Sequence, residues 1–355
     1  MVERVRVGVA GTSGWANFGY LPGLAAHPGA ELVAICGRDR DRAEDRARQY
    51  GIPRVFTDYR EMIAAADLQA LIVVTPDDLH HPIVMDALAA GLHVLCEKPL
   101  ALTTAQAREM YAAAEAAGVR HMVNFTYRWY PGFLHLRDLL AEGYVGRPYH
   151  CDLRFLAGYA RDTRYLWRYD RRRAHGVLGD LGSHMIDLAR WCLGDIARVS
   201  ARLGVAIARE GADGATLDPA NDHAALTVEF RDGSQGVIQA SAVVLMDGQW
   251  QEVAVHGERG TLAATASLEA AGVRGARGDE REARPLAIPD ALWGDLPPTS
   301  SPLALVQHAM GPRAFIDAIL ADRPASPSFY DGLKALEVVE AALISDREGR
   351  WVTLD

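Results

Sequence analysis

Residues 5–16 read VRVGVAGTSGWA, and this stretch decides the fold. The apolar run Val5–Ala10 passes directly into a glycine-containing turn, and a helical pattern follows. In the dinucleotide-binding fingerprint, a first glycine makes the tight turn, a second admits the pyrophosphate, and a third packs the helix closely. Gly11 takes the first position, Ser13 stands at the second, and Ala16 is the accepted substitute at the third. The alternative is an ordinary turn between a strand and a helix.

Further short apolar runs continue this beginning. They are too short for helices and rich in Val, Ile and Leu, as buried parallel strands are. The runs are Val5–Ala10, Leu32–Cys36, Ala70–Thr75, His93–Cys96 and His121–Phe125. Between them lie the helical patterns Asp39–Tyr50, Leu79–Ala90 and Thr103–Ala117. The alternation predicts an α/β domain, a Rossmann-type doubly wound parallel sheet, over residues 1–125.

After residue 125 the pattern changes to longer alternating stretches, which are typical of antiparallel strands. The predicted strands are Tyr149–Leu156, Val199–Ile207, Ala224–Phe230, Gln235–Val244 and Glu252–His256. The predicted helices are Pro131–Glu142, Leu178–Leu193, Leu303–Leu320 and Gly332–Ile344, and Ala270–Arg284 is expected to be a solvated loop or hairpin. Asp232-Gly233 is a hairpin signal, and Glu258-Arg259-Gly260 marks another turn. We therefore predict a second α+β domain over residues 126–355 with a mostly antiparallel open sheet.

Composition excludes several classes of protein. The chain has 355 residues and a net charge of −9, which argues against an extended nucleic-acid surface. The sequence contains no run of eighteen apolar residues, which argues against a membrane-spanning helix. The start of the chain lacks a signal-peptide pattern. The four cysteines are far apart, which favours reduced thiols and a cytoplasmic location over a disulfide framework or a structural zinc site.

The end of the second strand bears on the cofactor. An acidic residue at that tip binds the ribose 2′-hydroxyl of NAD, whereas a small residue and an arginine suit a 2′-phosphate. Here Gly37 and Arg38 occupy the tip, and Asp39 follows. The sequence favours NADP over NAD, although Arg38 and Asp39 can also be read as ordinary charges at the start of a helix.

Two later strands end in polar residues, at the edge where ligands of such sheets bind. Thr75-Pro76 follows one strand, and we predict that Thr75, Pro76 and His80 contact the cofactor. Glu97-Lys98-Pro99 follows the next strand, and a lysine there is expected to project over the crevice. The alternative for Glu97 and Lys98 is a surface ion pair. Pro99 restricts Lys98 to an extended conformation and allows a cis bond.

These motifs occur in a recognisable order. Over nearly the whole chain, the sequence resembles the Gfo/Idh/MocA oxidoreductase family. The motifs that carry the resemblance are the turn at Gly11, Thr75-Pro76, Glu97-Lys98-Pro99, Asn124–Arg128, Trp167–Asp170 and Gly176–Asp187. Ser13, His175 and Val177 depart from the family pattern at usually glycine-rich positions. The resemblance implies that Lys98, Asp180 and His184 form the active group.

The spacing of Asp180 and His184, four residues apart, places both on one face of the predicted helix. A histidine with a near-neutral pKa can take a proton from an alcohol, and a carboxylate can orient it or contact the substrate. The alternative is a local hydrogen bond between the two side chains. No third ligand with convincing spacing accompanies them, so no metal is predicted.

The remaining candidates fall into two groups. Aromatic and polar side chains expected to line the interdomain crevice and bind substrate, together with the active group, are Lys98, Tyr127, Arg128, Tyr130, Tyr159, Trp167, Asp180 and His184. Expected cofactor contacts are Gly11, Thr12, Ser13, Gly14, Trp15, Ala16, Gly37, Arg38, Thr75, Pro76, His80, Glu97, Lys98, Asn124 and Arg168. For Arg171–Arg173 we favour a solvated position.

Together these features predict an NAD(P)-dependent dehydrogenase or reductase that acts on a CH–OH group of a sugar, cyclitol or related polyol. One alternative is a glycosidase that oxidises its substrate transiently, and another is a non-catalytic dinucleotide or sugar sensor. The resemblance also implies a homodimer or homotetramer assembled through the open face of the second sheet, with no nucleic-acid or membrane partner.

Overall fold

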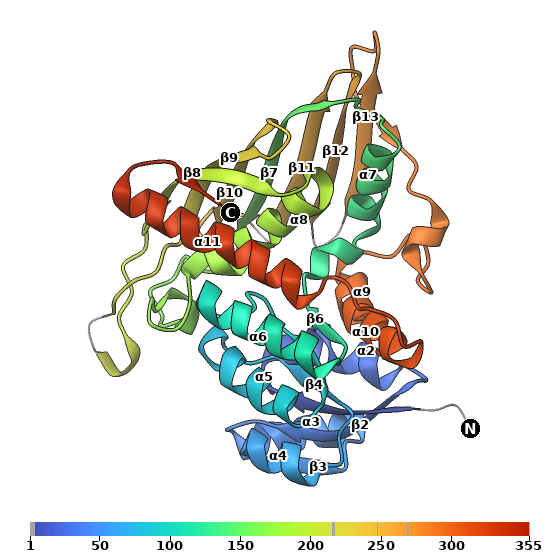
Figure 1. The fold of residues 1–355 in the computed structure, drawn as a ribbon, viewed down its shortest axis with the longest axis vertical. Coiled ribbons are helices and arrows are strands. Elements are labelled where there is room, and N and C mark those ends of the chain that lie inside the picture. Colours follow the sequence, from blue (N-terminus) through green and yellow to red (C-terminus); the bar gives the residue numbers. More distant parts are fainter. Residues whose placement is uncertain (1–3, 215–216, 247, 268–269, 355) are drawn as a thin grey trace. The chain divides into compact units, whose positions relative to one another are not determined.

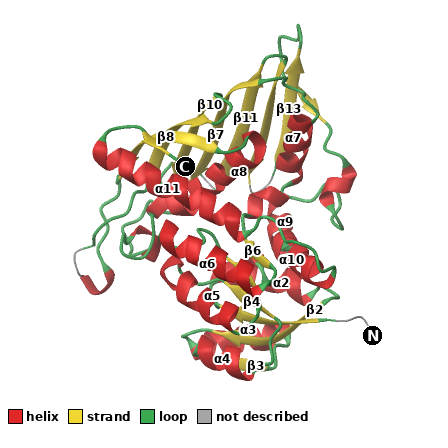
Figure 2. Cartoon of the chain, viewed as in Figure 1, coloured by secondary structure: helices red, strands yellow, loops and turns green. Residues whose placement is uncertain are grey.

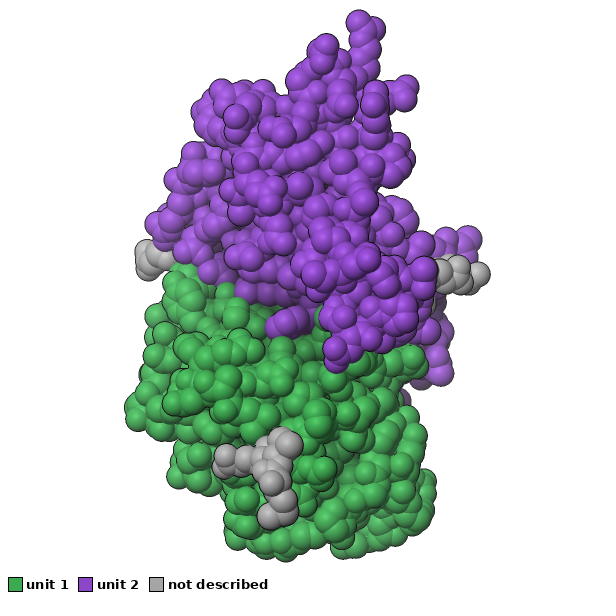
Figure 3. All heavy atoms as spheres, turned by 90° about the vertical axis from the view of Figure 1, so that its right-hand side faces the viewer, with its two compact units in different colours: residues 1–126, 306–336 green, residues 127–305, 337–355 purple. Residues whose placement is uncertain are grey.

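The computed structural model describes residues 4–214, 217–246, 248–267 and 270–354 (Figure 1). The chain forms two compact units, coloured separately in Figure 3. Residues 1–126 and 306–336 make up the first unit, and residues 127–305 and 337–355 make up the second. Each unit has its own sheet, called sheet A in the first and sheet B in the second.

Sheet A is fully parallel and has the strand order β3-β2-β1-β4-β5-β6. This is the order of a dinucleotide-binding sheet, which confirms the predicted fold class. Its strands are β1 (Val5–Ala10), β2 (Ala30–Cys36), β3 (Arg54–Phe56), β4 (Ala70–Val73), β5 (His93–Cys96) and β6 (His121–Val123). The strand β3 and the following helix α4 (Tyr59–Ala65) were not predicted from the sequence, because a three-residue strand gives almost no pattern.

Helices cover both faces of sheet A, which explains its nearly uninterrupted apolar strands. Contacts group α2 (Leu21–Ala25), α3 (Arg40–Tyr50) and α10 (Met310–Leu320) together, and α4, α5 (His80–Ala89) and α6 (Thr104–Ala117) together. Thr103 caps α6 by accepting a hydrogen bond from the backbone N–H of Gln106 at 3.2 Å. Segment 306–336 belongs to this unit because α10 packs on α2, β1 and β5.

Sheet B has nine strands in the order β14-β13-β12-β11-β7-β10-β9-β8-β15 (Figure 2). It is antiparallel except for the parallel pair β7 and β10. The strands are β7 (Pro148–Ala157), β8 (Ile196–Gly204), β9 (His223–Phe230), β10 (Gln235–Ser241), β11 (Gln249–Gly257), β12 (Gly260–Ser267), β13 (Ala271–Arg277), β14 (Arg284–Leu286) and β15 (Val352–Thr353). The segment expected to be a loop or hairpin between Ala270 and Arg284 is a hairpin, because β13 pairs with β14 in an antiparallel arrangement.

Burial alternates along the strands of sheet B, so its two faces differ. In β7, Cys151, Leu153 and Phe155 are buried, whereas His150 and Arg154 are exposed. The helices α7 (Pro131–Ala141) and α8 (Ser183–Leu193) pack on the buried face. The opposite face of β7 is polar and open to solvent.

Two predicted helices differ in detail from the structure. The pattern Leu178–Leu193 begins with a π-helical turn, Leu178–Gly182, and only then continues as α8. The pattern Leu303–Leu320 is broken into α9 (Pro302–Gln307) and α10, because Ala309 adopts a left-handed backbone with φ of 54°. The last helix, α11 (Phe329–Glu348), is longer than predicted. None of the helices in the described part of the chain combines the length and the apolar character of a membrane span.

Candidate functional site

The turn after β1 needs glycine at its first position. Gly11 has a φ of 130°, and a Cβ atom there would lie 2.2 Å from the carbonyl oxygen of Val74. Its backbone N–H donates a hydrogen bond to the carbonyl oxygen of Cys36 at 2.9 Å, which connects the turn to the end of β2. By contrast, a Cβ atom on Gly14 would meet nothing within 4 Å. The close approach of two strand ends therefore fixes Gly11 and leaves Gly14 open.

Ser13 has a local task that explains its departure from the glycine pattern. It is the N-cap of α1 (Gly14–Gly19), and its hydroxyl accepts a hydrogen bond from the N–H of Ala16 at 3.1 Å. Such a side-chain cap satisfies one of the orphan donors at a helix start. Ser13 therefore caps α1 with its side chain, which a glycine at this position could not do, and lacks the backbone flexibility of a glycine.

The tip of β2 presses against the same turn. A Cβ atom on Gly37 would lie 2.5 Å from the Thr12 side chain, so the small residue is required by packing. Arg38 is exposed. Asp39 caps α3, accepting from the N–H of Arg42 at 3.1 Å and pairing with the Arg42 side chain at 3.1 Å. The carboxylate that could serve a ribose is therefore engaged at the helix start.

Glu97 is a shared acceptor at the end of β5. Its Oε1 accepts from the indole N–H of Trp15 at 2.7 Å, from the Asn124 amide at 3.3 Å and from the hydroxyl of Tyr20. Its Oε2 accepts from the backbone N–H of Lys98 at 3.0 Å. With only 5% of its surface exposed, Glu97 holds α1, the start of α2 and the end of β6 around the Lys98 backbone. Tyr20, which sequence reasoning missed, carries no motif signal.

His80 differs from the expectation of a cofactor contact. It is fully buried; its Nδ1 lies 2.9 Å from the carbonyl oxygen of Pro99, and its Nε2 lies 3.0 Å from that of Thr75. Burial lowers the pKa of His80, against the raising effect of the two carbonyl groups. One ring nitrogen of His80 thus contacts the Lys98-Pro99 segment, whose peptide bond is cis, and the contact of His80 with the cofactor stays a prediction.

Two buried polar atoms beside these strand ends have no hydrogen-bond partner among the described residues. They are Oγ1 of Thr75, just beyond β4, and Oδ1 of Asn124, just beyond β6. A buried polar atom without a partner carries a desolvation penalty unless a ligand or water satisfies it. The strand ends of sheet A therefore offer unsatisfied groups where this class of sheet binds ligands.

His184 lies in an aromatic setting in the second unit. Its ring meets Tyr127 edge to face at a centroid distance of 4.6 Å, and Phe155 lies 6.2 Å away. Tyr127 also contacts Tyr130 at 5.0 Å. The Tyr130 hydroxyl is buried and has no partner among the described residues, and burial raises its pKa well above the ordinary value. This cluster thus combines the His184 imidazole, of a residue that is 5% exposed, with the Tyr130 hydroxyl, which has no hydrogen-bond partner among the described residues.

Asp180 lies on the π-helical turn, which corrects the prediction of one regular helix face shared with His184. The Tyr159 hydroxyl donates to its Oδ2 at 2.5 Å, and Nε of Arg168 lies 3.2 Å from the same atom. Tyr169 in turn donates to the Tyr159 hydroxyl at 3.3 Å. Desolvation and then the Asp180 charge raise the pKa of Tyr159 well above its ordinary value. The carboxylate therefore faces a tyrosine and an arginine, and the expected cofactor contact Arg168 lies beside it.

Arg128, a predicted substrate contact, forms a buried ion pair. Its Nε and Nη2 bond the two Asp187 oxygens at 2.7 and 2.5 Å, and both side chains are buried. Sequence reasoning quoted Asp187 within its motif but gave it no role. Arg171 and Arg172 pair with Asp218 and Asp170 and are largely exposed, whereas Trp167 lies under the Arg168 guanidinium at 4.4 Å.

Family models match both parts of the chain. Residues 5–125 match the model described as an oxidoreductase family with an NAD-binding Rossmann fold. Residues 133–263 match the model of the GFO/IDH/MocA C-terminal domain. These two ranges include the turn at Gly11, Lys98, Asp180 and His184.

Characterised relatives act on sugars and related compounds. A D-apiose dehydrogenase of Paraburkholderia graminis is 33% identical over 337 residues, covering 92% of this chain and 84% of that protein. A levoglucosan dehydrogenase of Pseudarthrobacter phenanthrenivorans is 28% identical over 248 residues, covering 64% of this chain and 63% of the relative.

Solved structures share the whole fold. A levoglucosan dehydrogenase in complex with NADH and L-sorbose has a TM-score of 0.90 at 25% identity and covers 99% of both chains. An oxidoreductase domain protein from Kribbella flavida has a TM-score of 0.88 at 29% identity and covers 100% of both chains.

Proposed function

The chain belongs to the Gfo/Idh/MocA family of oxidoreductases, and from this premise we propose that it interconverts a secondary alcohol and a ketone on a sugar, cyclitol or related polyol. The observation that carries the proposal is the relation to D-apiose dehydrogenase over 92% of the chain, because that span includes every residue of the proposed active group. The N-terminal part has an NAD-binding Rossmann fold.

The strand ends of sheet A fit a dinucleotide. Gly11 leaves a cradle that a Cβ atom would fill, and Thr75 and Asn124 present buried atoms that need a partner. We propose that the turn from Gly11 to Ala16, with the N–H groups at the start of α1, holds the pyrophosphate. When bound, the nicotinamide supplies the hydride acceptor and donor of the reaction.

The residues at the tip of β2 bear on the choice between NADP and NAD, because they are expected to lie near the 2′ position of the adenine ribose. Gly37 and Arg38 suit a 2′-phosphate, and Asp39 is occupied as a helix cap. On this basis we propose a preference for NADP over NAD. The direct measurement is the ratio of dissociation constants for the two dinucleotides in the wild type and in Arg38→Ala. Loss of any NADP preference in the variant supports the assignment, and an NAD preference in the wild type contradicts it.

Three side chains carry the proposed chemistry. Lys98 polarises the substrate oxygen and stabilises negative charge that develops there. His184 takes the hydroxyl proton in the oxidative direction and returns it in the reductive direction. Asp180 is held by Tyr159 and Arg168, so we propose that it orients the substrate hydroxyl rather than the imidazole.

The substrate contacts follow from the same groups. Tyr127, Tyr130, Tyr159 and Trp167 present aromatic faces or hydroxyl groups that suit a polyhydroxylated ring. The guanidinium of Arg128 is bound on two edges by Asp187, so we propose that it supports α8 and does not bind substrate directly.

A spectrophotometric screen at 340 nm tests the proposal. Sugars, cyclitols and their keto forms are offered with NAD(H) and NADP(H), and D-apiose and levoglucosan are included because related enzymes carry those names. Net reduction or oxidation of the cofactor with at least one compound is expected. Cleavage of a glycoside without net cofactor turnover would indicate the transient-oxidation glycosidase instead, and dinucleotide binding without turnover across the panel would indicate a sensor.

We also propose a homodimer or homotetramer. The open face of sheet B carries exposed apolar side chains such as Val237 and Trp250, which suit a subunit contact. Light scattering on a gel-filtration column gives the mass in solution, and a monomer would refute the assembly. The four free thiols are compatible with the cytoplasm, which we retain as the proposed location.

A further inference from the structure

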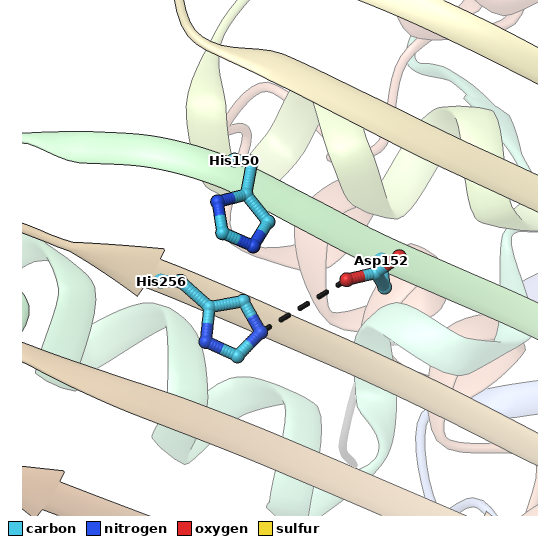
Figure 4. A group of neighbouring side chains, drawn as sticks. All are labelled: His150, Asp152 and His256. Carbon is cyan, nitrogen blue, oxygen red and sulfur yellow. Dashed lines mark ion pairs between the residues drawn. The ribbon is translucent and has the colours of Figure 1, made fainter.

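Strand register gathers three potential metal ligands on the open face of sheet B. In the antiparallel pair of β7 and β11, His150 lies directly opposite His256. Asp152 is two residues after His150, so the period of two in a strand places it on the same face. Figure 4 shows the three side chains converging there. One candidate ligand atom from each residue lies within 4.8 Å of those of the other two.

The geometry of His256 directs one nitrogen at this group. Its Nδ1 lies 3.0 Å from the hydroxyl oxygen of Thr261 on the neighbouring strand β12. A ring that donates from Nδ1 presents a lone pair at Nε2. That Nε2 lies 3.9 Å from Oδ2 of Asp152, which is also an acceptor. In the tautomer whose Nδ1 donates to Thr261, two acceptors face each other across this distance and repel each other unless a cation lies between them, whereas in the other tautomer Nε2 carries a proton toward Asp152.

The distance suits a cation. Zinc bonds to imidazole nitrogen at about 2.0–2.1 Å and to carboxylate oxygen at about 2.0–2.2 Å, so one ion can bridge atoms just under 4 Å apart. His150 stacks on His256 at a centroid distance of 4.6 Å with an angle of 22° between the rings, and its ligand nitrogen lies within 4.8 Å of the ligand atoms of the other two residues, so the His150 ring must turn out of the stack to bind the same ion. The hydroxyl of Thr261 fixes the His256 ring, as outer-shell partners of metal-bound histidines do.

We propose that His150, Asp152 and His256 bind one divalent transition-metal ion, such as Zn²⁺, on the open face of sheet B. Two imidazoles and one carboxylate favour zinc or a similar ion over Mg²⁺ or Ca²⁺, which prefer all-oxygen sites. The ion clips β7 to β11 through side chains, in addition to their backbone hydrogen bonds. Val237 of β10 lies directly opposite Asp152, so the site adjoins the subunit contact proposed above. The proposal is independent of the enzymatic activity.

A protonated His256 paired with Asp152 is the competing explanation, and the two make different predictions. The neighbouring charged residues are Arg154 and Glu252, which lie on the same face and are 3.9 Å apart. An ion pair requires no metal, and zinc would then bind no more tightly to the wild type than to a variant without the cluster. A metal site requires one ion per chain.

The experiment uses the full chain without an affinity tag, stripped by a chelator and titrated with Zn²⁺ against a chromophoric competitor at pH 7.5. One ion per chain is expected for the wild type. His256→Gln and Asp152→Asn are expected to lose this site. Thr261→Val, which keeps the side-chain shape but removes the hydroxyl, should weaken binding about 10–100-fold. His135→Gln, which removes an imidazole from α7 in the same unit, should bind as the wild type does.

Several outcomes overturn the proposal. They are the absence of a one-to-one site in the wild type, unchanged affinity in His256→Gln, and half an ion per chain, which would assign the ion to two copies. Circular dichroism and thermal melting of each metal-free variant separate loss of the site from loss of the fold. Substitution with Co²⁺ gives an independent readout, since a site of this type produces visible absorption bands that His256→Gln should abolish.

Discussion

The two sheets present their functional groups in different ways. Sheet A is covered on both faces, and the ligand groups that we propose lie at its strand ends, where Gly11, Thr75, Lys98 and Asn124 follow one strand each. Sheet B has one covered and one open face: on the covered face His184 of α8 lies near Phe155 of β7, and on the open face His150 projects from β7 itself. The strand ends of sheet A bring together residues from several strands at one edge, whereas the open face of sheet B brings together residues of neighbouring strands through their register.

The largest expected effect concerns the edge of sheet A. Lys98→Met keeps the length of the side chain but removes its charge, and turnover should fall about 10²–10⁴-fold. Binding of the dinucleotide, followed by fluorescence quenching, should stay close to that of the wild type because the turn at Gly11 is intact. Unchanged turnover would show that the strand end does not carry the chemistry.

The covered side of sheet B depends on a buried ion pair. Arg128→Met removes the charge that pairs with the buried Asp187 carboxylate, and the free energy of unfolding should fall by about 3–5 kcal/mol. Arg171→Met is the matched control, because both partners of that pair are more than half exposed and such pairs contribute about 0–1 kcal/mol. Urea denaturation measures both. Equal losses would contradict the distinction between buried and exposed pairs.

The backbone geometry at the edge of sheet A should be sensitive to one methyl group. Gly11→Ala places a Cβ atom 2.2 Å from the Val74 oxygen at a φ of 130°, so we expect a loss of about 1–3 kcal/mol and weakened dinucleotide binding. Gly14→Ala, where the added atom meets nothing within 4 Å, is the control for stability. Thermal unfolding and dinucleotide titration measure the two effects. Similar losses of stability in both variants would refute the argument from close approach.

His80 should make the same edge sensitive to acid. Its pKa is lowered in the folded state by burial, while in the unfolded chain it is about 6.5. Below that pH the unfolded chain binds the extra proton and the folded chain does not, so stability decreases as the pH falls. His80→Gln should therefore lose less stability than the wild type between pH 7 and pH 5. Parallel curves from urea titrations at several pH values would contradict this account.

The smallest effect is expected at the Tyr130 hydroxyl. Tyr130→Phe removes a buried group that has no partner among the described residues, so the fold should lose little. If the hydroxyl binds substrate, KM should rise by the equivalent of about 0.5–1.5 kcal/mol while kcat changes little. An unchanged KM would remove Tyr130 from the substrate contacts.

The same contrast explains what the sequence predicts well. The parallel strands and the ends of the helices between them follow from local patterns. Asp39 and Thr103 are helix N-caps, and Gly118 ends a helix with a left-handed backbone. Asp232-Gly233 likewise joins β9 and β10. In each case the information lies within a few neighbouring residues.

Partners that are distant in the chain are what the sequence does not reveal. Nothing local indicates that Glu97 accepts from Trp15 and Tyr20, or that Asp187 binds Arg128. The three residues around His256 come together only through the register of β7 and β11. The sequence equally gives no sign that both ring nitrogens of His80 contact backbone carbonyl groups, because this depends on the path of the chain around Pro99.

The π-helical turn at Leu178–Gly182 restricts how this segment can change in length. Deleting one residue within it would restore a regular α-helix and rotate the preceding chain by about 100° relative to α8. Asp180 would then swing away from Tyr159 and Arg168 while His184 stayed in place. An insertion or deletion of a single residue in this turn is therefore not tolerable, and alignments of related chains should be gap-free across it.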